Sequence, residues 1–135
     1  MDRALSRKGE KHAAAMSSWL NDRLPENTQI LCSPSRRTLQ TVAFLKRSYQ
    51  VCEEVSPDAN AGALLKAARW PHCPSAVLVV AHQPFLAETV EHLLNLHPAK
   101  PLSFRKGGIW WLRHRNQDGV SDVALVGVIN PEILI

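Results

Sequence analysis

The sequence lacks the features that would cross a membrane or cross-link the chain. Its longest aliphatic run, Ala76 to Ala81, has six residues, whereas a transmembrane helix needs roughly 20. Cys32, Cys52 and Cys73 form no Cys-x-x-Cys pair, so neither a disulfide framework nor a zinc knuckle is expected. No apolar stretch follows the first residues, which argues against a secretory signal. We therefore expect a cytoplasmic protein.

Charge and length set further bounds. The 135 residues carry 16 Lys plus Arg against 12 Asp plus Glu, a formal net charge of +4, and 45% are hydrophobic. A chain of this kind suits one domain with a real core, so we expect a single domain over residues 1–135. A net charge of this size is common for solubility and does not by itself identify a partner. No metal or cofactor is expected, because five histidines show no ligand spacing: His12, His72, His92, His97 and His114.

The spacing of apolar residues predicts helices that alternate with short strands. Such alternation is typical of an α/β fold, here a three-layer sandwich with a mostly parallel central sheet and an antiparallel edge. Ser6 and Ser33 are the expected N-caps of the first two helices. The expected elements are a helix at 6–23, a strand at 28–32, a helix from Ser33-Pro34 to about Tyr49, a strand at 51–55, a helix at 62–69, a strand at 76–81, a helix from Pro84 ending before Pro98, and hairpin strands at 108–113 and 123–129.

Two loops at the expected carboxyl ends of strands carry basic side chains. Arg36 and Arg37 fall in the first turn of a helix, where positive charge opposes the macrodipole unless an anion binds. His82 follows the strand at 76–81 and could donate a hydrogen bond or move a proton. The plainer alternatives are solvated arginines and a structural histidine. Because both loops should lie on one rim of the sheet, we favour a shared phosphate site.

Five segments match, in chain order, the pattern of a known family: Asp2–Gly9, Ile30–Thr41, Val77–Pro84, Gly107–Trp110 and Asn130–Leu134. The block Ser-Pro-x-x-Arg-x-x-Gln-Thr, followed further along by a strand ending in His, is the most specific part. Together they resemble the histidine phosphatase superfamily, in particular its SixA-type phosphohistidine phosphatases.

The resemblance implies a role for several residues. Arg37 would be a phosphate-binding arginine and His82 an active-site histidine. Ser33, which opens the block, is grouped with them as a phosphate-binding residue. Asp58, in the loop after Pro57, is the candidate general acid, and Arg36 has no matching role.

One part of the family pattern is missing. Its members begin with an apolar strand ending in Arg-His-Gly, whose histidine attacks phosphorus, and no Arg-His-Gly occurs here. Arg113-His114 lies in the predicted hairpin and is no substitute. Covalent catalysis needs a nucleophile, which stabilisation by Arg37 and His82 cannot replace. The chain as given is therefore not expected to turn over. The expected explanation is a start assigned too far downstream; a truncated chain and a noncatalytic relative are the alternatives.

The missing strand would be central to the family's sheet. Its neighbours would be left with unpaired backbone groups, a costly arrangement for an isolated domain. If the chain folds as given, we expect it to pair across that gap with a second copy or another partner.

The predicted function is removal of phosphate from phosphohistidine on a signalling protein, with a small phosphoester as the other substrate class. A noncatalytic phosphate- or phosphoprotein-binding module is the alternative. Trp110, Trp111, Arg113 and Arg115 could instead form a platform for single-stranded nucleic acid. The plainer interpretation is that one tryptophan faces the core and the other lies on a strand edge. Neither nucleic acid nor a membrane is the expected partner.

Overall fold

The structure of the protein, a computed structural model, describes residues 3–100 and 102–134. Short strands alternate with helices along the chain, which confirms the predicted α/β class. No described helix is both long and apolar enough to cross a membrane. The elements are α1 (Arg7–Asn21), β1 (Gln29–Cys32), α2 (Arg36–Ala43), β2 (Gln50–Val51), the 3-10 helix η1 (Glu53–Val55), α3 (Ala61–Ala67), β3 (Val77–Val80), α4 (Phe85–Leu93), β4 (Ile109–Gln117), β5 (Val120–Ile129) and α5 (Pro131–Leu134).

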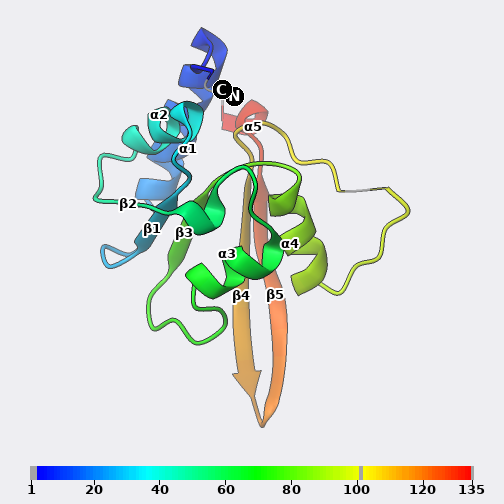
Figure 1. Cartoon of the computed structure of the whole chain (residues 1–135). Helices are drawn as coiled ribbons and strands as arrows, with labels where there is room; N and C mark the ends of the chain where they lie inside the picture. The colour runs from blue at the N-terminus through cyan, green and yellow to red at the C-terminus, as the bar shows by residue number, and fades with distance from the viewer. Residues whose placement is uncertain (1–2, 101, 135) are drawn as a thin grey trace.

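The strands form two sheets. One is parallel, with the order β2-β1-β3, and the other is the antiparallel pair β4-β5. In the parallel sheet Cys32 is in register with Val51 on one side and Val80 on the other, so all three strands end at the same edge. The predicted parallel sheet and antiparallel pair are thus both present. The pair forms a ladder of its own, and its lower part extends beyond the rest of the molecule (Figure 1).

Helices cover both faces of the parallel sheet, which gives the predicted three layers (Figure 1). Alternate residues of a strand point to opposite faces. Ile30 and Cys32 pack in a cluster with residues of α1 and α2. Leu31 packs on the other face, in a cluster that includes Leu64 of α3 and Phe85 of α4. The middle strand is therefore buried from both sides, and its position fixes where the following loop begins.

The predicted start and end of the second helix are wrong. Ser35, not Ser33, is the N-cap, and its side chain accepts a hydrogen bond from the Thr38 amide. The backbone N–H of Ser33 still donates to the Val80 carbonyl at 3.0 Å, so the chain remains in the strand ladder there. The helix ends at Ala43, and Lys46 adopts a left-handed φ of 54°, which stops it well before Tyr49.

Other boundaries also differ from the prediction. The strand expected at 51–55 is only β2, followed directly by η1, while the hairpin strands are longer than expected. Their turn consists of Asp118 and Gly119, with φ values of 53° and 78°, the positive angles that a tight two-residue hairpin requires. The short helix α5 was not predicted.

Strand β3 pairs with β1 along one side only. No other described strand pairs with its second edge, and Val77 to Val80 are all half-buried although every one is apolar. An edge of this kind presents unpaired backbone groups that another strand could meet.

Candidate functional site

The site begins where β1 and β3 end. Ser33 directly follows β1, and His82 lies shortly after β3. Because the two strands are parallel neighbours, the residues meet although 49 positions separate them. The Nε2 atom of His82 lies 2.7 Å from Oγ of Ser33, and which of the two donates the hydrogen depends on the imidazole tautomer. The structure therefore joins the two predicted loops through a direct hydrogen bond.

Burial and hydrogen bonds from α2 fix the position of Ser33. Its exposed fraction is 0%, and its carbonyl accepts a hydrogen bond from the Thr38 hydroxyl at 2.8 Å. The hydroxyls of Thr38 and Ser35 are in turn 2.7 Å apart. The buried Thr38 thus ties the first turn of α2 back onto Ser33. Sequence reasoning missed Thr38, although its place three residues after a serine is a common pattern at a helix start.

Arg37 lies in the same first turn of α2 and is exposed. That turn contains no acidic residue, so the backbone N–H groups of the helix end and the arginine charge add together. The pKa of His82 is lowered, first by burial of the ring and then by the positive charge of Arg37. The imidazole is therefore mostly neutral near pH 7, and the positive charge of Arg37 acts on it directly.

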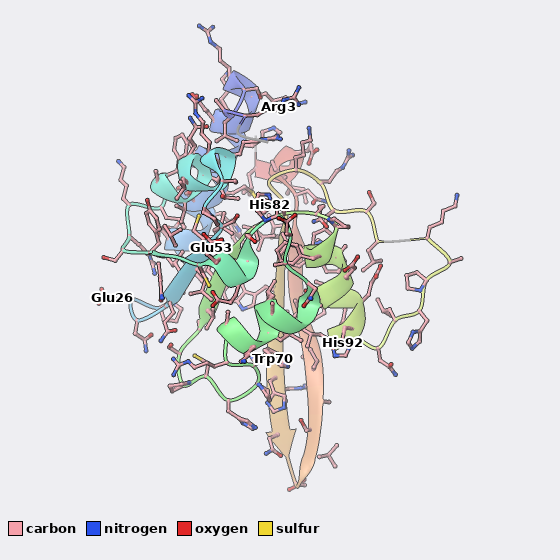
Figure 2. The ribbon with its side chains drawn as sticks, viewed as in Figure 1. Arg3, Glu26, Glu53, Trp70, His82 and His92 are labelled. Atoms are coloured by element: carbon pink, nitrogen blue, oxygen red, sulfur yellow. The ribbon has the colours of Figure 1, made fainter. Side chains whose placement is uncertain are left out.

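Taken together, these groups suit a small oxyanion. A guanidinium presents a planar fork of N–H donors, and a neutral imidazole supplies one more. An anion bound between them would favour the charged imidazole and offset the effect of the Arg37 charge on the pKa of His82, so binding would draw a proton onto the ring. Figure 2 shows His82 in the body of the molecule, below Arg3. Within the part of the chain that the structure describes, no group of three or more His, Cys, Asp and Glu could hold a metal ion.

The carboxylates near the site are less clearly engaged. Asp58 is exposed in the loop between η1 and α3, and no hydrogen bond between described residues joins it to Ser33, Arg37 or His82; its role stays a prediction. Glu53 was missed. It follows β2 at the same edge of the sheet, where the Cys52 amide donates to the Cys32 carbonyl at 2.9 Å, and Figure 2 labels both Glu53 and His82. Sequence reasoning missed Glu53 because the pattern predicts a strand that continues over 51–55, whereas β2 ends at Val51 and η1 begins at Glu53.

The hairpin tryptophans are occupied within the molecule. Trp110 stacks on Phe104 with ring centroids 4.7 Å apart, and Trp111 meets Trp19 edge to face at 6.2 Å. Arg115 forms an ion pair with Asp122. Stacking platforms for nucleic acid need free ring faces, so this arrangement disfavours the nucleic-acid interpretation.

In open α/β sheets ligands bind beyond the carboxyl ends of the strands, and this is where Ser33, Arg37 and His82 lie. No protein-family model matches the chain. An uncharacterized protein from Picosynechococcus sp. is 34% identical over 119 residues, which cover 83% of this chain and 72% of that protein. At this identity and coverage, the chain belongs to the same family as the Picosynechococcus protein.

Solved structures of SixA phosphohistidine phosphatases have the same fold. The putative SixA of Nakamurella multipartitia superposes with a TM-score of 0.77 at 22% identity, covering 96% of this chain and 86% of that one. A SixA protein histidine phosphatase complexed with tungstate gives 0.74 at 23% identity, with coverages of 99% and 88%. The putative SixA of Agrobacterium tumefaciens gives 0.76 at 23% identity, with 96% and 85%. The predicted histidine phosphatase fold is thereby confirmed.

The effect of the Arg37 charge can be measured as a change in the pKa of His82. Replacing Arg37 by Gln should raise the pKa of the His82 ring toward its ordinary value, because one of the causes that lower it is removed. The shift should be partial, since burial remains. An NMR titration of the ring protons, assigned with His82→Asn, measures it. Lys46→Gln, which removes a charge at the far end of α2, should leave the pKa unchanged; an equal effect from both variants would contradict a local action of Arg37.

Proposed function

We propose that this protein binds a phosphoryl group between Arg37 and His82, with the buried Ser33 acting on phosphate through the His82 ring that it contacts, and that the site is that of a phosphohistidine phosphatase. The observation that carries the proposal is the 2.7 Å contact between His82 Nε2 and Ser33 Oγ, beside an arginine whose charge acts on the same imidazole. The shared fold supports it, as does the tetrahedral oxyanion tungstate bound in one of the similar proteins.

Each residue would have a distinct role. Arg37 would hold two phosphoryl oxygens through its guanidinium fork, aided by the N-terminus of α2. His82 would donate a hydrogen bond and stabilise charge that develops on the phosphoryl oxygens. Ser33, immobilised through Thr38, would fix the ring orientation of His82. Asp58 remains the candidate proton donor to a leaving group.

The nucleophile is the open part of the proposal. Phosphoryl transfer through a covalent intermediate needs a nucleophile at the phosphorus atom. Among residues 3–100 and 102–134 no hydrogen bond or ring contact joins a second histidine to His82, and the 135 residues contain no Arg-His-Gly. This observation favours the second candidate function, a noncatalytic phosphate- or phosphoprotein-binding module, for the chain taken by itself.

The proposal extends to partners and location. The phosphoryl donor would be a phosphohistidine-bearing signalling protein or a small phosphoester, met in the cytoplasm by a single domain spanning residues 1–135. Both substrate classes present the same tetrahedral dianion to Arg37 and His82, so the pocket alone does not choose between them.

Binding of tungstate tests the site. Arg37→Gln should weaken it about 10- to 100-fold, because a charge-assisted hydrogen bond is worth about 1.5–3 kcal/mol. Lys46→Gln should change it less than about twofold. Isothermal titration calorimetry gives these affinities. If Lys46→Gln weakened tungstate binding as much as Arg37→Gln, the binding would reflect a general attraction to positive charge, and the proposed site would be contradicted.

The same titration has a predicted pH dependence. Anion binding should raise the lowered pKa of His82, so the complex takes up a proton and affinity should increase as pH falls from about 8.5 to about 6.5. His82→Asn should flatten this dependence. A wild-type affinity that is constant over the range would remove His82 from the anion site.

Turnover should depend on an added nucleophile. The 135-residue chain should release no phosphate from a phosphohistidine protein, because stabilising groups alone do not attack phosphorus. The same chain preceded by an apolar strand ending in Arg-His-Gly should release it, and replacing the histidine of that added segment by Asn should abolish the release. Phosphate release by the 135 residues that is lost in His82→Asn would contradict the need for an added nucleophile.

The open edge of β3 supports self-association. A second copy could cover the unpaired backbone and half-exposed apolar side chains of Val77 to Val80. Sedimentation velocity over a range of concentrations should show a species heavier than 15.0 kDa. Monomeric behaviour at every concentration would refute this.

A further inference from the structure

Basic side chains are concentrated in the chain segments that contact α2, which carries Arg37, and in the loop that packs on α1. Eight of the 16 Lys and Arg residues fall in three short segments, 3–11, 36–37 and 105–106, which together contain one acidic residue, Glu10. We use the name basic face for five exposed cations of the segments 3–11 and 105–106, leaving out Arg105, which forms an ion pair with Glu132: Arg3, Arg7, Lys8, Lys11 and Lys106.

Contacts within the molecule bring the three segments together. The Leu5 amide, just before α1, donates to Oε1 of Gln40 at 2.7 Å. Gln40 lies three residues after Arg37 on α2, so the two share a helix face. On the other side, a Cβ built on Gly107 would lie 3.7 Å from Cβ of His12, so the 105–107 loop packs on α1. In Figure 2 Arg3 lies above His82, in the upper half of the view.

The positions of the cations on α1 are electrostatically unfavourable for the helix. Arg7 and Lys8 fall in the first turn, where the helix dipole disfavours positive charge. Arg7 and Lys11 are four residues apart, a like-charge pair that weakens a helix. The ion pairs between described residues are Arg105–Glu132 and Arg115–Asp122, and neither neutralises α1. A partner that supplies negative charge would offset this repulsion.

We propose that the basic face docks an acidic protein surface and steers its phosphorylated residue to Arg37 and His82; the inference rests on the proposed function and deepens it. Carboxylates that flank the phosphorylated residue would meet Lys8 and Lys11 while the phosphoryl group reaches the site. A protein is favoured over nucleic acid because the aromatic rings next to the 105–107 loop, Phe104 and Trp110, stack on each other, which takes up one face of each ring that a base would need for stacking.

Two peptides of equal length test the proposal. Both carry a central non-hydrolysable phosphohistidine analogue, flanked by Glu in one peptide and by Gln in the other. The wild-type chain should bind the Glu-flanked peptide about tenfold more tightly at low salt, and the preference should shrink as salt screens the charges. The Lys8→Gln/Lys11→Gln variant should lose most of that preference.

A matched control keeps the test specific. The Lys46→Gln/Lys66→Gln variant loses as much positive charge as Lys8→Gln/Lys11→Gln, but near the C-terminal end of α2 and on α3. It should keep the preference for the Glu-flanked peptide. Equal binding of both peptides by the wild-type chain, or an equal loss in the control variant, would overturn the proposal. So would tighter binding of a single-stranded oligonucleotide, or of vesicles containing phosphatidylserine, than of the Glu-flanked peptide.

Tungstate separates this inference from the proposed function. Its affinity should be nearly the same in the wild-type chain and in both double variants, because the site itself is intact. If Arg37→Gln leaves tungstate binding unchanged, the phosphoryl site fails. If tungstate binding depends on Arg37 while peptide preference does not depend on Lys8 and Lys11, only the basic face fails.

Discussion

The hydrogen bond between Ser33 and His82 is the contact on which the site depends. It joins the ends of two parallel strands. The orientation of a side chain at either end therefore depends on how firmly those strands are held. The ladder continues through the Ser33 amide to the Val80 carbonyl, and Thr38 holds the Ser33 carbonyl from the helix side. The imidazole is therefore positioned by backbone pairing and a buried hydroxyl together, before any ligand arrives.

That orientation is preserved because β1 is buried from both faces. Ile30 and Cys32 pack toward α1 and α2, while Leu31 packs toward α3 and α4. A strand with a core on each side cannot change register by one residue without exchanging the two sets of side chains. The rim that carries Ser33 and Arg37 is consequently fixed by apolar packing, and its polar groups do not have to hold the fold together.

Much of this arrangement could be predicted from local patterns. The periodic apolar residues of α1 and α4, and the continuous aliphatic run of β3, identify their elements directly, and placing Arg37 and His82 at strand ends follows from the geometry of parallel sheets. What local patterns could not supply was contact between distant segments. Ser33 and Ser35 are both plausible N-caps, and only the pairing of Ser33 with Val80 excludes the first. Glu53 lies just past the carboxyl end of β2 because that strand has only two residues, which the sequence at 51–55 does not indicate.

The hairpin is joined to the body in a different way from the parallel strands. Its ladder is separate from that of β2-β1-β3 among the described residues, and ring contacts such as Trp19 with Trp111 and Trp70 with His114 connect it to the rest. Local opening of β4 and β5 would thus break side-chain packing but no ladder of the parallel sheet. The proposed phosphoryl site lies at the edge of the parallel sheet, so opening of the hairpin would leave the ladder under the site intact but would uncover the cluster of Ile30 and Cys32, on which Ile109 packs.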